Sequence, residues 1–95
     1  MSNMRVTVTF VGVLGRLIHE GSFEVVFSGA ATCRDLMGAI WNRFGEAMPG
    51  PLWNLEANTF KEPIFALVNG SPVDSPELSL KDGDDVKFLT LVAGG

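Results

Sequence analysis

Residues 32–45 of the 95-residue chain read TCRDLMGAIWNRFG and contain the strongest helix signal in the sequence. Thr32 stands three residues before Asp35, which is the arrangement of a capping residue followed by an acidic residue in the first turn. Apolar residues then recur at helical spacing: Leu36, Met37, Ile40, Trp41 and Phe44. Gly45 stands where a left-handed C-cap would end the helix. The stretch therefore predicts one amphipathic helix that offers a single face to a core.

Cys33 falls on the apolar face of this helix, and it is the single cysteine of the chain. We favour a buried structural thiol, because no second cysteine or neighbouring base accompanies it. A reactive thiol is the alternative, since a helix N-terminus can lower a thiol pKa. One cysteine can form neither an internal disulfide nor a two-cysteine metal knuckle, and we expect no metal site.

Strand patterns stand on both sides of the helix. Residues 4–13 alternate, with Met4, Val6, Val8 and Phe10 on one side, and residues 23–27 are expected to pair with them as an antiparallel hairpin. Residues 64–68 predict a short strand ended by a tight turn at Asn69-Gly70. Val86, Phe88 and Thr90 then alternate with Lys87, Leu89 and Leu91 in a last strand.

The segments between these strands lack sustained periodicity. Residues 45–63 are expected to form an irregular excursion, folded back onto the body by Trp53, Leu55 and Phe60. Residues 71–80 are also expected to be irregular, with a short helical turn that places Leu78 and Leu80 against the core. Residues 81–85, KDGDD, lack the ligand spacing of a calcium loop, and we interpret them as a solvated hairpin corner.

The order of these elements predicts an α+β fold in one domain spanning residues 1–95. A mixed sheet with one main helix packed on one face accounts for it, provided that the first and last strands lie near the centre of the sheet. That arrangement is the ubiquitin-like β-grasp. We expect residues 91–95 to be a flexible C-terminal tail.

Composition disfavours two classes of partner. The chain has a net charge of −4 and a pI near 4.7, which disfavours nucleic acid and anionic membranes. Arg5 and the alternating threonines interrupt any apolar run at the N-terminus, so we expect no signal peptide and a cytoplasmic location.

The sequence ends on Leu91-Val92-Ala93-Gly94-Gly95. Glycine contributes little packing and loses much backbone entropy on ordering, and what two terminal glycines offer instead is a narrow backbone without side chains. A tail without Cβ atoms at Gly94 and Gly95 could pass through a tunnel in a partner and present its carboxyl carbon. A frayed terminus is the alternative.

Strand alternation also predicts a partner surface. The helix can cover only the sheet face that carries Val6, Val8, Phe10, Val68, Val86 and Phe88. The opposite face would then expose an apolar patch at Val11, Phe65, Leu67, Leu89 and Leu91, and such a patch usually marks an interface. The alternative is that the excursion at 45–63 covers this face.

Three segments together resemble the MoaD/ThiS family of ubiquitin-like sulfur carriers: Leu67-Val68-Asn69-Gly70, residues 80–88 (LKDGDDVKF) and Val92-Ala93-Gly94-Gly95. The resemblance spans the whole chain. Within the family the chain is more similar to the small subunit of molybdopterin synthase than to the shorter thiamine-pathway carrier, because of the long excursion and the VAGG ending.

The resemblance implies a mechanism in which Gly95 is the modified residue. An E1-like adenylating enzyme would use ATP to convert the Gly95 carboxylate into an acyl-adenylate, and a sulfur donor would displace AMP to leave a thiocarboxylate. The large subunit of molybdopterin synthase, or an equivalent acceptor, would then receive the sulfur. The chain itself would bind no cofactor and supply no catalytic residue, and His19 is expected to be solvated.

Three functional classes remain open at the level of sequence. The first is a sulfur carrier for molybdopterin, with thiamine or cysteine biosynthesis as other pathways. The second is a ubiquitin-like protein modifier that uses the same activated glycine. The third is a β-grasp interaction module with incidental glycines.

Overall fold

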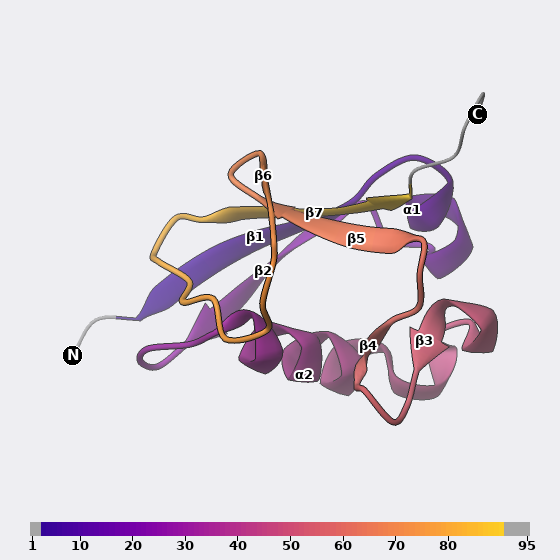
Figure 1. Ribbon diagram of the computed structural model, residues 1–95, viewed down its shortest axis with the longest axis horizontal. Coiled ribbons are helices and arrows are strands. Elements are labelled where there is room, and N and C mark those ends of the chain that lie inside the picture. The colour runs from indigo at the N-terminus through magenta and orange to yellow at the C-terminus, as the bar shows by residue number, and fades with distance from the viewer. Residues whose placement is uncertain (1–2, 91–95) are drawn as a thin grey trace.

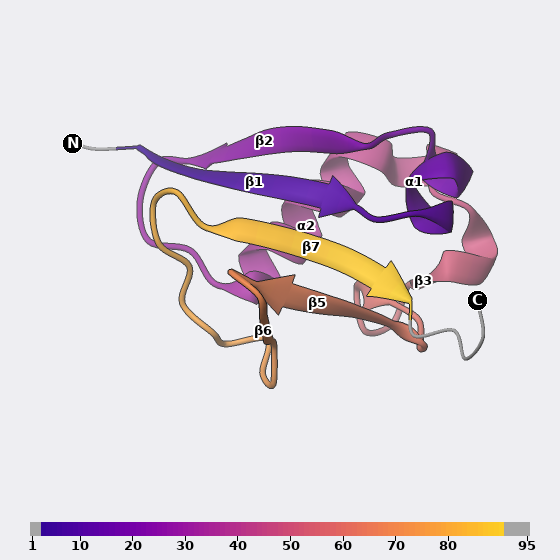
Figure 2. The ribbon, with the colours of Figure 1, turned by 90° about the horizontal axis from the view of Figure 1, so that it is seen from above.

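The computed structural model describes residues 3–90, which form a mixed five-stranded sheet with one long helix packed across one face (Figure 1). The strands of this sheet are β1 (Met4–Phe10), β2 (Ser22–Phe27), β5 (Ile64–Val68), β6 (Ser71–Pro72) and β7 (Asp85–Thr90). Their order is β2-β1-β7-β5-β6, so the first and last strands lie in the middle, as predicted. Figure 2 views the sheet from the face opposite the long helix, and neither that helix nor the segment 53–60 lies in front of β1 and β7.

The two central strands supply the middle of the core. β1 is antiparallel to β2 and parallel to β7, with Val8 opposite Val86 and Phe10 opposite Phe88. The even-numbered residues of β1 are buried and its odd-numbered residues are not, which confirms the predicted alternation. The Phe10 ring contacts the rings of Phe23, Phe44, Phe60 and Phe88 at centroid distances of 5.7 to 5.9 Å.

The long helix is α2 (Cys33–Phe44), and it begins as the sequence predicts. The Thr32 hydroxyl accepts a hydrogen bond from the backbone N–H of Asp35, and the Asp35 carboxylate accepts one from the backbone N–H of Thr32 at 2.9 Å. This reciprocal pair is a complete capping box. At the other end Gly45 has a positive φ of 48° but a ψ of −124°, so it ends the helix without the predicted left-handed helical conformation.

The predicted strand over 4–13 is too long, because β1 ends at Phe10 and a short helix follows it. This helix is α1 (Val13–Ile18), and it buries Leu14 and Ile18 while His19 ends it with a φ of 64°. The sequence interpretation missed α1 because its six residues include a glycine, which weakens a helical pattern. The β1–β2 connection is therefore a helix and not a tight hairpin turn.

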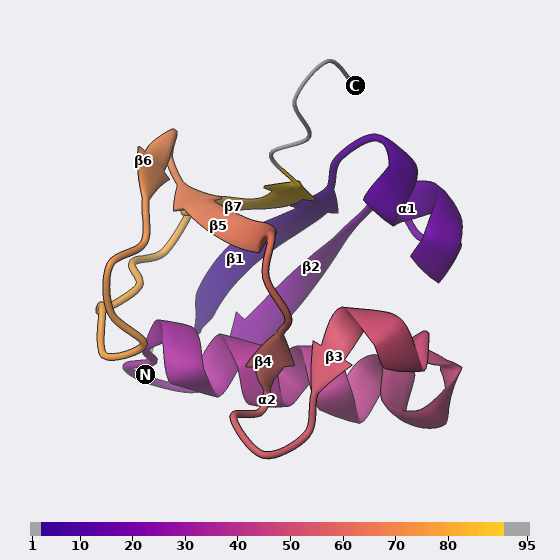
Figure 3. The same ribbon diagram turned by 45° about the vertical axis from the view of Figure 1, so that its right-hand side comes forward.

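The excursion at 45–63 is more ordered than predicted. It contains two 3₁₀ turns, Gly45–Ala47 and Gly50–Leu52, and a two-stranded hairpin of β3 (Trp53–Asn54) and β4 (Thr59–Phe60). Trp53 stacks on Trp41 of α2 at 5.4 Å, so the hairpin stands beside the helix (Figure 3). Leu55 is 70% exposed, which contradicts the prediction that it anchors this segment. Nor does the segment cover the open face of the sheet.

Residues 71–80 lie between β5 and β7 in the chain and pass the start of α2. Ser71–Pro72 pair with β5 as β6, and no helical turn forms. The chain then crosses to α2, where the backbone N–H groups of Cys33 and Arg34 donate to the carbonyls of Leu78 and Pro76 at 2.9 and 2.8 Å. These bonds satisfy two of the donors that a helix N-terminus leaves free.

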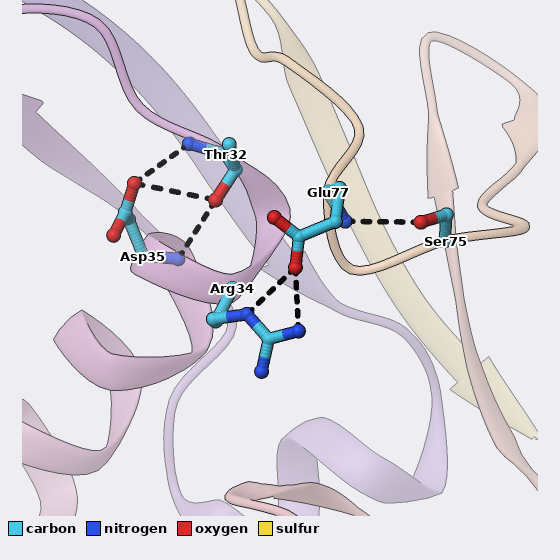
Figure 4. A network of polar contacts seen from close by, with 5 residues as sticks. All are labelled: Thr32, Arg34, Asp35, Ser75 and Glu77. Atoms are coloured by element: carbon cyan, nitrogen blue, oxygen red, sulfur yellow. Dashed lines mark hydrogen bonds and ion pairs between the residues drawn. The ribbon is translucent and has the colours of Figure 1, made fainter.

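Side chains reinforce this connection. Arg34 pairs with Glu77, with 2.8 Å between Nε and Oε1 (Figure 4). Leu80 is buried as predicted, whereas Leu78 is 41% exposed and does not join the core. None of the helices within residues 3–90 could span a membrane.

Candidate functional site

β7 is the element that leads to the predicted functional tail. It is bonded on both sides, to β1 and to β5, and its last residue, Thr90, lies opposite Ile64. The backbone N–H of Val11 donates to the Phe88 carbonyl at 2.9 Å, which continues the parallel pairing one step past β1. The tail residues Leu91, Val92, Ala93, Gly94 and Gly95 lie outside the described residues. Their attachment point is therefore a strand held in the centre of the sheet.

A hydrogen-bonded link between two turns fixes where β7 starts. Asn69 donates through Nδ2 to the carboxylate of Asp84 at 2.8 Å, and its Oδ1 accepts from the backbone N–H of Asp85, also at 2.8 Å. The other Asp84 oxygen accepts from the Lys81 backbone N–H at 2.8 Å. Asp84 is only 7% exposed, and its carbonyl accepts from the Thr7 N–H. A buried carboxylate needs such donors, because an unpaired one would be very costly.

Asp82 extends the same link to β1. One of its carboxylate oxygens accepts from the backbone N–H of Arg5 at 2.8 Å, and the Gly83 N–H donates to the Arg5 carbonyl at 2.7 Å. Gly83 has a φ of 88°, a conformation that favours glycine. The prediction of a solvated corner at 81–85 is thus wrong for Asp84, which ties the start of β7 to β5 and β1.

The predicted interface residues lie on the open face of the sheet. Cross-strand neighbours on this face form three rows, each with one residue from β7 and one from either side of it. From the end of β7 toward its start, the rows are Val11, Leu89 and Phe65; then Thr9, Lys87 and Leu67; then Thr7, Asp85 and Asn69. The row nearest the tail is entirely apolar, the second is mixed and the third is polar. Val11 is 39% exposed, and the other three residues of the predicted interface, Phe65, Leu67 and Leu89, are half-buried. The apolar character of this face is therefore concentrated beside the start of the tail.

Helix α1 adds two residues that sequence analysis did not assign to this region. Val13 and Leu17 lie one turn apart on its outer side and are 47% and 49% exposed. Figures 2 and 3 show α1 next to the ends of β1 and β7. Its sequence signal is a pair of interleaved i, i+4 repeats, in which Leu14 and Ile18 face the core while Val13 and Leu17 face away.

The nucleophilic and basic side chains do not form a catalytic group. Cys33 is buried, as favoured from the sequence, and burial together with the negative charge of Asp84 raises the pKa of its thiol. The thiol is therefore protonated at neutral pH. His19 is exposed, also as predicted. No cluster of three or more metal-binding side chains occurs within residues 3–90.

A comparison with models of protein families finds one match for this sequence. The model of the ThiS family matches residues 8–95, which covers both turns of the Asn69–Asp84 link and the terminal glycines. No similar sequence is found among curated proteins.

Solved structures with the same architecture support the fold. SAMP1 of Haloferax volcanii superposes with a TM-score of 0.77 at 19% identity, covering 96% of this chain and 99% of that one. The molybdopterin-converting factor of Helicobacter pylori, a complex of subunits 1 and 2, contains a chain with a TM-score of 0.63 at 27% identity, with 97% and 100% covered. The BexX/CysO complex of Amycolatopsis orientalis gives 0.65 at 28% identity, with 95% and 99% covered. The ubiquitin-like β-grasp prediction is confirmed.

Proposed function

We propose a sulfur-carrier function for this chain, which belongs to the ThiS family of ubiquitin-like sulfur carriers: the family model matches nearly its whole length. The chain carries sulfur as a thiocarboxylate on Gly95. The Gly95 carboxylate is a poor electrophile, so an E1-like adenylating enzyme first joins it to the AMP moiety of ATP and releases pyrophosphate. A sulfur donor then displaces AMP. The chain contributes the arm, while ATP and the catalytic groups belong to its partners.

The observation that carries this proposal is the apolar row Val11, Leu89 and Phe65 beside the attachment point of the tail. A partner that docks on this row sits next to Thr90, and five further residues reach Gly95. Five extended residues span at most about 18 Å. This reach suits a terminal carboxylate delivered into a buried site of the docked partner, through the slim segment Leu91, Val92, Ala93 and Gly94.

We assign the sulfur to molybdopterin biosynthesis, where the acceptor is the large subunit of molybdopterin synthase or its equivalent. Two observations support this choice: the length of the segment between α2 and β5, and the likeness to a chain of the Helicobacter pylori molybdopterin-converting factor. Transfer moves the sulfur from Gly95 to a pterin carbon, and water restores the carboxylate.

The pathway can be tested with a form of the chain that already carries a thiocarboxylate on Gly95, prepared by cleaving an intein fusion with sulfide. Mixed with a molybdopterin synthase large subunit and the pterin precursor, it should return to the carboxylate mass while a dithiolene product accumulates. A parallel reaction with a thiazole-forming synthase of the thiamine pathway should leave the sulfur in place. The reverse pattern would assign the chain to thiamine biosynthesis instead.

A protein modifier is the second candidate, because SAMP1 of Haloferax volcanii has the same fold and is named small archaeal modifier protein 1. A modifier would join Gly95 to lysines, and denaturing gels of native cells would then show a ladder of larger species that reducing agents do not remove. We expect no such ladder. Fragment spectra that link Gly95 to lysine side chains would favour the modifier.

A further inference from the structure

The two outer edges of the sheet are protected to different degrees. At one edge, β6 has only two residues, and one of them is Pro72. Short edge strands and prolines are common protections against further strand pairing. At the other edge, β2 has six residues and an unbroken register with β1, without proline, glycine, lysine or bulge. None of the strands within residues 3–90 lies beyond β2, which Figure 2 shows along one side of the sheet.

The free edge of β2 carries a row of backbone groups without partners. The Phe10 N–H donates to the Gly21 carbonyl at 2.8 Å, and in the same register the odd-numbered residues of β2 bond to β1. Ser22, Glu24 and Val26 therefore turn their N–H and C=O groups away from β1. Within residues 3–90, none of these outward groups has a hydrogen-bond partner. The edge can accept another strand without losing any bond that it already makes.

The side chains of this edge are mostly apolar on both faces of the sheet. Val26 is 51% exposed on the open face. On the helix face, Val25 and Phe27 pack against the core but are only half-buried. Glu24 is the one charged residue of the strand, and its carboxylate lies 3.8 Å from the guanidinium of Arg5. A regular apolar edge of this kind favours strand addition.

A second copy of β2 fits this edge in an antiparallel register centred on Val25. In that register Val25 lies opposite Val25 of the second copy, and Phe27 lies opposite Phe23 of the second copy. Every pair on the helix face is then apolar, and apolar cross-strand pairs stabilise a sheet. The half-buried side chains of Val25 and Phe27 lose further exposure to water, which favours the pairing.

Charge on the open face selects the same register. Glu24 lies opposite Val26 of the second copy, and Arg5 of that copy is the next residue along the row, because Arg5 is the β1 neighbour of Val26. The outward N–H and C=O groups of Glu24 and Val26 bond to each other across the pair. A register centred on Glu24 would instead place two carboxylates directly opposite each other, which is destabilising.

We propose that two copies of the chain associate through β2, about a two-fold axis normal to the sheet, and join their sheets into one. The helix α2 then lies on the same side of the joined sheet in both copies. The apolar row Val11, Leu89 and Phe65 contains no residue of β2 and stays free in both copies. The inference concerns an additional interface and does not depend on sulfur chemistry.

Analytical ultracentrifugation of the full-length chain tests the association. Because an interface of two short strands is small, we expect a monomer–dimer equilibrium that becomes visible between roughly 10 µM and 1 mM. Val26→Pro should weaken the association about tenfold or more, since by symmetry it removes two of the four bonds between Glu24 and Val26. An edge strand tolerates proline where the N–H faces solvent, so circular dichroism should show an intact fold. Val26→Thr keeps the N–H and is the matched control, with association near the wild-type value.

Cysteine pairs test the register. Directly opposite residues that are not hydrogen-bonded lie about 4.5 Å apart between Cα atoms, which is within the range of a disulfide. With Cys33 replaced by Ala, we therefore expect Val25→Cys to form a covalent dimer in a glutathione redox buffer and Glu24→Cys to remain monomeric. The proposal is overturned by a chain that stays monomeric throughout this concentration range. It is equally overturned by equal association of the Val26→Pro and Val26→Thr variants, or by cross-linking of Glu24→Cys in preference to Val25→Cys.

Discussion

At the scale of single residues, the Asn69–Asp84 link explains why LVNG and KDGDD stand where they do. Two turns separated by 15 positions share one buried carboxylate, and Asn69 satisfies it while also bonding to the start of β7. Sequence analysis found both turns from their local chemistry. It could not find the link, because no local pattern shows which distant amide meets which carboxylate.

Replacing Asn69 with Ala tests the link. The change removes one donor from the buried Asp84 carboxylate, so we expect the free energy of unfolding to fall by about 2 kcal/mol. Asn58→Ala is the matched control, because Asn58 also has a positive φ, 53° against 50°, but its side chain makes no hydrogen bond within residues 3–90. Urea unfolding measures both. Equal losses would mean that backbone strain, and not the link, accounts for the effect.

Cys33 should make stability depend on pH in the alkaline range. Burial, and then the charge of Asp84, raise the pKa of the folded thiol above its ordinary 9.0. The unfolded chain therefore loses this proton first as the pH rises, so the contribution of the thiol is complete below about pH 9 and is lost above it. Between pH 7 and pH 10, wild type should lose more stability than Cys33→Ala. Parallel losses would contradict this.

At the scale of elements, two helical glycines should respond to alanine with opposite signs. Gly38 lies inside α2 with no atom within 4 Å of an added Cβ, so Gly38→Ala should raise the free energy of unfolding by about 0.5–1 kcal/mol. In α1, the Cβ of Gly15→Ala would lie 2.7 Å from the Phe10 carbonyl oxygen, and the variant should be destabilised. Thermal unfolding of both variants measures these changes in stability. A stabilising Gly15→Ala would mean that α1 does not pack against the end of β1 as described.

The elements that sequence analysis predicted correctly are those with a long local pattern. Strand alternation in β1 and β7 and the capping box of α2 are read directly from neighbouring residues. The β3–β4 hairpin was missed because each strand has two residues and depends on tertiary contacts, such as the Trp53–Trp41 stack. Leu55 and Leu78 were wrongly placed in the core, since hydrophobicity alone does not fix the direction of a loop side chain.

At the scale of the whole molecule, the open face should bind a partner without contributing much to stability. Phe65→Asp and Leu89→Asp each place a charge in the apolar row beside the tail. We expect the Tm of both variants to stay nearly unchanged, and their binding to the partner to weaken by about 2 kcal/mol or more. Val26→Asp is the control, because Val26 is 51% exposed on the edge strand β2 and pairs with Arg5, at the end of β1 away from the tail. Unfolding of the Phe65 and Leu89 variants would show instead that this face is part of the core.

The sheet face and its apolar patch could be predicted because alternation assigns every second strand residue to one side. The contribution of Val13 and Leu17 could not, since it depends on a helix placed beside β7 by packing. The role of Gly95 rests on chemistry that a partner supplies, so neither strand pattern nor packing can establish it.

The mass of the intact chain shows whether Gly95 accepts sulfur. After incubation with its adenylating enzyme, ATP and a sulfide source, the chain should exchange one oxygen for one sulfur at Gly95. A variant that lacks Gly95, and another with one residue appended after it, should fold normally and show no exchange. Exchange that persists in either variant, or a wild-type mass that does not change, would contradict the sulfur-carrier account.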